Sequence, residues 1–333
     1  MSRLAALDLG SNSFHLLVAD TVPGGGIKRR DTSKLTLRLA EPVAKTGELG
    51  RQARDRATEA FTQLVREARR AGAQRLVAVA TEALRLAADG TRLREKWERD
   101  TGVRVKLISG MEEAELSLRG MVGALSLRPG ADLLGMDLGG GSYEVAYGGL
   151  GPMRAAVSLP FGSARLAARS GHDPLRLSER VALYAETMEA LVPLVEQVRG
   201  LREAGPLRAA GTAGTIRDFG RCGLALAGGV TPEQVRGLVV TRPQLEVAYA
   251  RIVSMTTAER VDLPGVSPKR VDLLPAGGAV VLATMEAFGL EQLELCDWGL
   301  REGALLDVLD GAHVVTDGDF TDLAERVSRS RRG

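Results

Sequence analysis

A glycine-rich segment in the middle of the chain combines groups that can hold a phosphate and a metal. Residues 135–144 read Gly-Met-Asp-Leu-Gly-Gly-Gly-Ser-Tyr-Glu, with an apolar run before them and an alternating run after them. Successive amides without Cβ atoms can form a concavity that binds an anion. A carboxylate at a strand end, here Asp137, suits a divalent metal. The segment predicts a phosphate-binding hairpin; a plain structural hairpin is the alternative.

The same pattern occurs at the N-terminus. Residues 5–13 read Ala-Ala-Leu-Asp-Leu-Gly-Ser-Asn-Ser, again an apolar strand, Asp-Leu-Gly and a small polar turn. Two such units, each opening one half of the chain, indicate an internal duplication. A purely structural duplication would not need the aspartate and the polar turn in both copies. We therefore expect two hairpins that clamp one phosphate group from both sides.

Two further segments could contribute to the same chemistry. Residues 211–215, Gly-Thr-Ala-Gly-Thr, follow an expected strand and open a helix, where amides can bind an anion. An ordinary strand-to-helix turn is the alternative. Glu112 and Glu113 lie in the first turn of another expected helix. They either complement the helix dipole, or one of them points toward the phosphate.

Composition excludes several classes of protein. The 333 residues are 44% hydrophobic and 26% charged, with a net charge of +2, as in soluble globular proteins. No run approaches the roughly 18 apolar residues of a membrane-spanning helix, and Asp8 argues against a signal peptide. The arginine-rich residues 328–332 lack the aromatic residues of a nucleic-acid site. We expect a cytoplasmic protein that binds neither nucleic acid nor membranes.

The cysteines and histidines predict no metal centre of their own. Cys222 and Cys296 are far apart and lack histidine neighbours, so we expect buried thiols and no disulfide. The three histidines are scattered, which argues against a zinc site.

The length suits two domains of roughly 100–200 residues each, built from alternating strands and helices. Apolar and alternating runs predict strands at 5–9, 14–19, 76–80, 103–108, 133–138, 142–148, 153–159, 207–210, 238–241 and 293–296. Residues 27–39, which include basic side chains, predict edge-type strands. Helical periodicity predicts the main helices at 51–70, 109–125, 178–198, 245–255 and 271–288. Beyond about residue 310 we expect a loosely packed tail.

Four segments in this order carry a resemblance to a known family. Residues 7–16, 80–85, 108–114 and 137–144 are similar to motifs of the exopolyphosphatase/guanosine pentaphosphate phosphohydrolase (Ppx/GppA) family, in its short two-domain form. Residues 211–215 and 299–303 fall where that family has corresponding segments. The resemblance extends from the first residues to about residue 309.

The resemblance implies an α/β protein with a duplicated actin/hexokinase/Hsp70-like (ribonuclease H-like) ATPase fold, two domains around a cleft. Domain I would span 1–125, with the first hairpin and a catalytic glutamate. Domain II would span 126–302, with the second hairpin. Residues 303–333 would form a helix that returns to domain I, followed by the tail.

The resemblance also implies roles for individual residues. Glu113 would be the catalytic base and Arg85 would add positive charge. Asp137, Glu144 and Asp8 would hold Mg²⁺, or Mn²⁺ in its place. The phosphate would be bound by Gly10, Ser11, Asn12, Ser13, Gly139, Gly140, Gly141, Ser142, Gly211, Thr212, Gly214 and Thr215.

The implied function is hydrolysis of the terminal phosphate of inorganic polyphosphate, with short chains favoured by the compact form. The alternatives are hydrolysis of the 5′ phosphate of guanosine pentaphosphate and a non-catalytic regulator that binds such ligands. A kinase is less well supported, because we find no acceptor-binding motif. Glu115, Tyr143 and residues 296–298 depart from the family pattern and bear on substrate preference. The sequence leaves oligomeric state open, with a homodimer as the candidate assembly.

Overall fold

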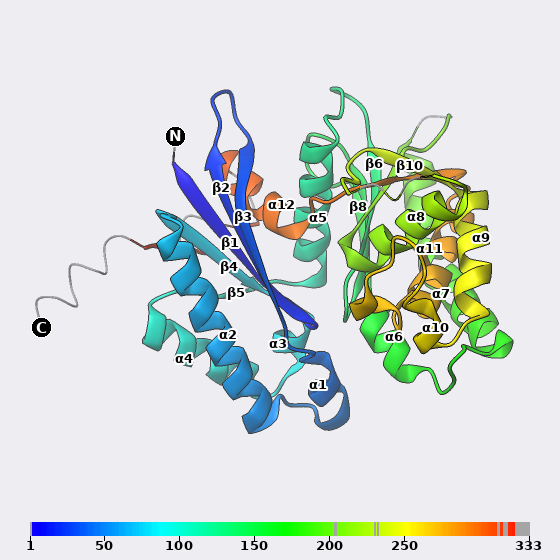
Figure 1. Cartoon of the computed structure of the whole chain (residues 1–333). Coiled ribbons are helices and arrows are strands. Elements are labelled where there is room, and N and C mark those ends of the chain that lie inside the picture. Colours follow the sequence, from blue (N-terminus) through cyan, green and yellow to red (C-terminus); the bar gives the residue numbers. More distant parts are fainter. Residues whose placement is uncertain are drawn as a thin grey trace, which may run out of the picture. The chain divides into compact units, whose positions relative to one another are not determined.

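The computed structural model describes residues 2–202, 205–229, 231, 233–311, 314–315 and 319–323. Contacts divide the chain into two compact units (Figure 1). Unit 1 comprises residues 1–123 and 300–333, and unit 2 comprises residues 124–299.

Unit 1 is built on a mixed sheet of six strands. These are β1 (Arg3–Leu9), β2 (Ser13–Thr21), β3 (Ile27–Thr36), β4 (Arg75–Ala80), β5 (Lys106–Leu107) and β12 (Phe320–Asp322). The order is β12-β4-β1-β2-β3, and β5 also pairs with β4. Strand β1 is antiparallel to β2 and parallel to β4. The chain thus passes from a hairpin into a parallel crossover.

The helices of unit 1 complete its layers. They are α1 (Ala40–Thr46), α2 (Gly50–Arg70), α3 (Glu82–Leu86), α4 (Gly90–Thr101), α5 (Gly110–Ala124) and α12 (Leu300–Leu309). Side chains of α2 and α4 share one buried cluster with alternate residues of β1 and β2. In this cluster Trp97 stacks on Phe61 with ring centroids 4.6 Å apart. Helix α12 also contacts β1, so the last helix belongs to the unit that contains the N-terminus.

Unit 2 contains a second six-stranded sheet. Its strands are β6 (Leu133–Leu138), β7 (Tyr143–Gly148), β8 (Ala155–Leu159), β9 (Ala209–Thr212), β10 (Leu238–Thr241) and β11 (Gln292–Leu295), in the order β10-β11-β9-β6-β7-β8. Its helices are α6 (Ser163–Arg169), α7 (Leu177–Leu201), α8 (Ala213–Leu226), α9 (Arg242–Val253), α10 (Thr257–Arg260) and α11 (Leu274–Ala287). Helix α11 is buried throughout residues 274–285, as expected of a helix that is apolar on all sides.

The two sheets share one topology. In unit 1, the first strand lies between an antiparallel second strand and a parallel fourth strand, and the second strand pairs with the third. Unit 2 repeats this arrangement with β6, β7, β8 and β9. The short helices α1 and α6 each follow the third strand. This repetition confirms the predicted duplication and the predicted α/β fold class.

Two expectations about unit 1 are corrected. The strand expected over 103–108 is limited to β5, and the tail expected beyond residue 310 includes β12, which pairs with β4. Strand β5 pairs with β4 only at residues 79–80, so the rest of this edge of β4 is open to β12. The apolar side chains of Val314, Val315 and Leu323 are buried. His313 and the arginine-rich end lie outside the described residues.

The cysteines, possible metal-ligand clusters and long apolar helices were also addressed by the sequence. Both cysteines are buried, as predicted, and burial raises the pKa of Cys222 to about 11. Within the described ranges, no cluster of three or more acidic, histidine or cysteine side chains could hold a metal. No helix in those ranges is long and apolar enough to cross a membrane.

Candidate functional site

In unit 2, the glycine turn between β6 and β7 is held from one side by helix α6. The carbonyl oxygens of Gly139, Gly140 and Gly141 accept hydrogen bonds of 2.9–3.1 Å from the amides of residues 162–165. In a trans peptide the N–H points opposite to the C=O. The amides of residues 140–142 therefore point away from α6, as an anion-binding turn requires.

Gly162 allows this close contact between the turn and α6. A Cβ atom on Gly162 would lie 2.2 Å from the backbone carbon of Gly141. Ser163 then links the turn to the segment that follows β9, because its hydroxyl donates to Gly139 O (3.1 Å) and is bonded to Thr215 Oγ1 (3.1 Å). Gly162 and Ser163 are not among the site residues predicted from the sequence, although a glycine directly before a helix is visible in it.

Four polar side chains form a row across unit 2 beside this turn. Thr212 on β9, Asp137 on β6, Glu144 on β7 and Ser158 on β8 are register partners on neighbouring strands. Glu144 is buried, and its Oε1 accepts a 2.7 Å hydrogen bond from the Ser158 hydroxyl. Like charges directly opposite each other are unfavourable, so a cation between Asp137 and Glu144 would stabilise the pair.

Gly299 keeps the row open at one end. A Cβ atom there would lie 3.3 Å from Thr212 Cγ2 and 3.7 Å from Asp137 Oδ2. The backbone before α12 thus lies close to both polar side chains. Residues 299–303 resemble a family segment in sequence, but Gly299 is not among the predicted site residues.

An arginine lies against the start of α8. The guanidinium of Arg270 is bonded to the buried Asp218 through Nε (2.7 Å) and Nη2 (3.0 Å). A Cβ atom on Gly214 would lie 3.0 Å from this guanidinium. Asp218 therefore fixes a positive charge over the 211–215 segment. Residues 218 and 270 are far apart in the chain, and no local sequence pattern predicts this pair.

The first hairpin of unit 1 repeats the hydrogen bonding of the second. Ser11 O accepts from Ala40 N at 3.0 Å, and Asn12 O accepts from the amides of residues 37 and 38 at 2.8 and 2.9 Å. The amides of Asn12 and Ser13 therefore point away from these partners. The Ser11 hydroxyl accepts a 3.1 Å hydrogen bond from Ala83 N, which links the turn to α3.

The corresponding side-chain row differs between the two units. Asp8 on β1 is opposite His15 on β2, which is opposite Lys34 on β3. Unit 2 has a second carboxylate, Glu144, where unit 1 has His15. The pair best suited to a divalent cation is therefore in unit 2, because the register partners of Asp8 are His15 and Val79 and include no second carboxylate.

The two candidate acids at the start of α5 have different surroundings. Glu112 forms a capping box with Ser109: its Oε2 accepts from Ser109 N at 2.7 Å, and its own amide donates to Ser109 Oγ at 3.2 Å. Glu112 thus caps its own helix, which was one of the two predicted roles. Glu113 follows it, half-buried, with its Oε2 atom shielded from solvent. Arg85 contacts the same region, since its Nη1 donates to Ile108 O at 2.6 Å.

Tyr143 does not face the polar row. Its side chain is fully buried and its hydroxyl donates to Thr284 Oγ1 of α11 at 2.9 Å. Alternate residues of a strand point to opposite faces of the sheet, so Tyr143 and Glu144 lie on different sides of it. The departure at Tyr143 therefore affects packing in unit 2. The expectation that it bears on substrate preference is not supported by its position.

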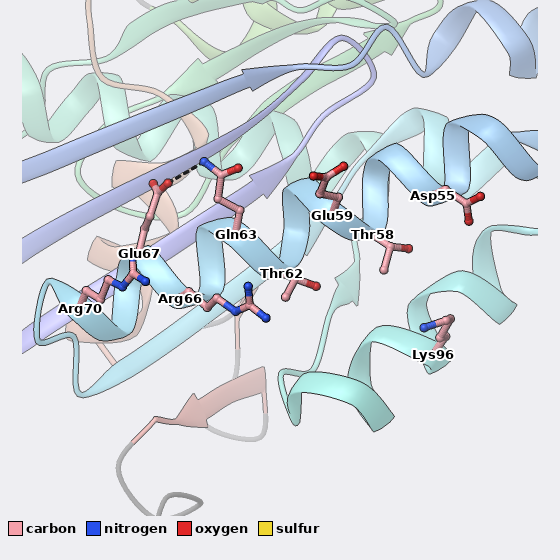
Figure 2. A pocket seen from close by; sticks show the side chains of 9 residues that line it. All are labelled: Asp55, Thr58, Glu59, Thr62, Gln63, Arg66, Glu67, Arg70 and Lys96. Carbon is pink, nitrogen blue, oxygen red and sulfur yellow. Dashed lines mark hydrogen bonds between the residues drawn. The ribbon is translucent and has the colours of Figure 1, made fainter.

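A hollow of about 660 Å³ on unit 1 is a separate feature. Figure 2 shows its side chains along α2, with Lys96 on α4. It is lined by Asp55, Thr58, Glu59, Thr62, Gln63, Arg66, Glu67, Arg70 and Lys96. Three acidic and three basic groups balance one another there, and Gln63 donates to Glu67 at 2.8 Å. Such a balanced surface offers a polyanion no net attraction.

Two units with this strand order define the duplicated actin/hexokinase/Hsp70-like fold. Within that class the chain belongs to the Ppx/GppA phosphatase family, whose family model matches residues 17–312. This membership confirms the resemblance inferred from the motifs.

Several relatives are similar over most of the chain. Exopolyphosphatase 1 of Mycobacterium leprae is 31% identical over 332 residues, which cover 99% of this chain and 95% of that protein. The guanosine-5′-triphosphate,3′-diphosphate pyrophosphatase of Aeromonas hydrophila is 28% identical over 310 residues, 93% of this chain and 60% of that protein. The crystal structure of an exopolyphosphatase from Cytophaga hutchinsonii has a TM-score of 0.84 and 25% identity, covering 95% of this chain and all of that one. The Aquifex aeolicus Ppx/GppA structure has a TM-score of 0.79 and 26% identity, covering 94% and 99%.

Proposed function

We propose that the protein is an exopolyphosphatase that hydrolyses the terminal phosphate from inorganic polyphosphate. The observation that carries this proposal is the turn at residues 139–142, whose amides point away from α6 beside the carboxylate pair Asp137 and Glu144. Amides can bind the oxygens of a phosphoryl group, and carboxylates can hold the cation that neutralises it. The name and full-length match of the Mycobacterium leprae relative support the same substrate.

The proposal assigns the phosphate-binding role to both hairpins and to the start of α8. Amides and hydroxyls of residues 10–13, 139–142 and 211–215 would bind the terminal phosphoryl oxygens. The positive charge of Arg85 would stabilise the phosphoryl oxygens, which become more negative in the transition state. Arg270, held over Gly214 by its ion pair with Asp218, would brace the start of α8.

The residues present fit a bound Mg²⁺, with Mn²⁺ as a substitute. Mg²⁺ is usually held by one or two carboxylates, with water and substrate phosphates as its other ligands. Asp137 and Glu144 supply such a pair, and the buried Glu144 carboxylate accepts a hydrogen bond from the Ser158 hydroxyl. Asp8 would contribute from unit 1. The cation would neutralise phosphate oxygens and orient the substrate.

Glu113 is the proposed general base. Water attacks the terminal phosphorus in line with the bridging oxygen, the bond from phosphorus to that oxygen breaks, and Glu113 accepts the proton from water. Because Glu112 caps its own helix, the proposal assigns this step to Glu113, the other acid of the pair. The products are inorganic phosphate and a polyphosphate one unit shorter.

Guanosine pentaphosphate is the second candidate substrate. The Aeromonas hydrophila relative carries the name of a pyrophosphatase for that nucleotide and matches 93% of this chain. The same hairpins, base and cation would serve either anhydride.

The test is phosphate release from short-chain polyphosphate and from guanosine pentaphosphate, measured side by side with Mg²⁺ and after chelation. We expect rapid, Mg²⁺-dependent release from polyphosphate and slower release from the nucleotide. Preference for the nucleotide would select the second candidate. Binding of both ligands without release from either would contradict catalysis and indicate a regulator.

A further inference from the structure

The described residues after α12 form a strap on unit 1. We call Val314, Val315 and residues 319–323 the C-terminal strap. Its strand β12 pairs with β4 at residues 75–77, and Leu323 N donates to Gln74 O at 3.0 Å. The Thr321 hydroxyl accepts a 3.1 Å hydrogen bond from the amide of Arg104, just before β5. The strap therefore holds the segment that leads into α5.

The strap contacts the first turn of α5 through Lys106. The Lys106 ammonium donates to Val314 O and lies 3.6 Å from Asp319 Oδ2, so two points of the strap hold it. The same ammonium lies 3.4 Å from Glu112 Oε1. Burial acts to raise the pKa of Glu112, but the Ser109 hydrogen bonds and Lys106 outweigh it and lower that pKa. Glu112 is thus held as a carboxylate, one residue before Glu113.

A second contact lies two turns further along α5. The carboxylate of Asp307 on α12 is fully buried, and its Oδ2 accepts from the amides of Val314 (3.0 Å) and Val315 (2.7 Å). Its Oδ1 accepts from Arg119 Nη1 of α5 at 2.9 Å. Glu112 and Arg119 are seven residues apart, so they lie on one face of the helix. The strap therefore restrains α5 both along and around its axis.

We propose that the C-terminal strap positions the general base, with Lys106 and Asp307 as the positioning residues. Neither side chain is assigned a contact with substrate. Lys106 fixes the first turn of α5 through Glu112, and Asp307 fixes the body of the helix through Arg119. Rotation of α5 is the motion that would displace Glu113, and these two contacts oppose it. The inference rests on the proposed function only for its kinetic consequence.

The kinetic test compares Lys106→Met, Lys106→Arg and the control Lys96→Met in the full-length chain. Lys96 is ion-paired with Asp100 within α4 and has no part in the strap. A displacement of about 1 Å can cost a reaction about 100-fold. We expect Lys106→Met to lower kcat about tenfold or more with KM within about twofold, and Lys106→Arg to restore most of the loss. Wild-type kcat in Lys106→Met would overturn the proposal.

Hydrogen exchange supplies a readout that does not depend on activity. The amide of Glu113 donates to Ser109 O at 2.9 Å in the first turn of α5. We expect it to exchange faster in Lys106→Met and in Asp307→Asn, with the amides of α2 unchanged. Unchanged exchange in both variants overturns the positioning role. If the wild type releases no phosphate, the proposed function fails, and the exchange rates still decide whether the strap holds α5.

Discussion

At the scale of single residues, side chains alternate along β7, so that Tyr143 and Glu144 lie on opposite faces of the sheet. Glu144 points to the face that carries Asp137 and Ser158, whereas Tyr143 is bonded to Thr284 in the core. The two neighbours are therefore a natural pair of variants, since one change alters the proposed cation site and the other alters only the interior.

Glu144→Gln should weaken the response to Mg²⁺. Loss of one carboxylate charge is expected to raise the Mg²⁺ concentration for half-maximal activity about tenfold or more. Tyr143→Phe removes one buried hydrogen bond, which is expected to cost about 1 kcal/mol of stability and to leave the Mg²⁺ response unchanged. Metal titrations of phosphate release measure both. Equal Mg²⁺ responses in Glu144→Gln and the wild type would remove Glu144 from the site.

At the scale of elements, each hairpin depends on the helix that follows the third strand. The amides of residues 162–165 at the start of α6 donate to the carbonyls of residues 139–141. The amides of residues 37, 38 and 40, at and just before the start of α1, donate to the carbonyls of Ser11 and Asn12. The turn alone does not set the direction of its amides. Its partners, 20 to 30 residues further along the chain, do so.

Gly162→Ala tests this dependence. The new Cβ atom would lie 2.2 Å from Gly141 C, so the turn or α6 must shift. We expect a loss of about 1–3 kcal/mol of stability together with reduced phosphate release. Gly151→Ala is the control, because a Cβ atom there meets nothing within 4 Å. Urea unfolding and activity assays measure both variants, and equal results for the two would contradict the assigned role of α6.

Three strands of unit 1 are also joined by one carboxylate. Asp20 on β2 accepts from Arg3 Nε (2.7 Å) on β1 and Arg30 Nε (2.5 Å) on β3, and these bonds lower its pKa from 3.8 to about 2. A lowered folded-state pKa stabilises the fold above the ordinary pKa, and that contribution is lost as the pH falls to about 2.

The expected outcome is a stability difference between wild type and Asp20→Asn that is present at pH 5 and shrinks between pH 4 and pH 2. Urea midpoints of both proteins across this range provide the measurement. A difference that stays constant as the pH falls would show that the ion pairs do not stabilise unit 1.

Much of the fold could be predicted because its signals are local. The two Asp-Leu-Gly turns, the strands beside them and the glutamate pair are each contained in about ten residues. The two turns with their strands predicted the duplication. The Arg270–Asp218 pair, the contact between Gly162 and Gly141, and the pairing of β12 with β4 join residues far apart in sequence. The periodicity of a sequence does not predict such long-range contacts. The contacts that support the site and the C-terminal strap are therefore seen only in the structure.

At the scale of the whole molecule, a duplicated fold has diverged in chemistry. Unit 2 contains the carboxylate pair Asp137 and Glu144, whereas unit 1 contains Glu113, Arg85 and a row of Asp8, His15 and Lys34. Each unit also has its own hydrophobic core. The proposed division assigns the cation mainly to unit 2 and the activation of water to unit 1.

The most direct test of this account is the rate of Mg²⁺-dependent phosphate release from polyphosphate by Glu113→Gln, compared with Glu115→Gln. Both variants make the same change on one helix, and only Glu113 is assigned to water activation. General-base catalysis is typically worth about 100- to 10,000-fold. We expect a loss of that size in Glu113→Gln, with unchanged unfolding midpoint, and near wild-type rates in Glu115→Gln. Near-normal release by Glu113→Gln would contradict the mechanism.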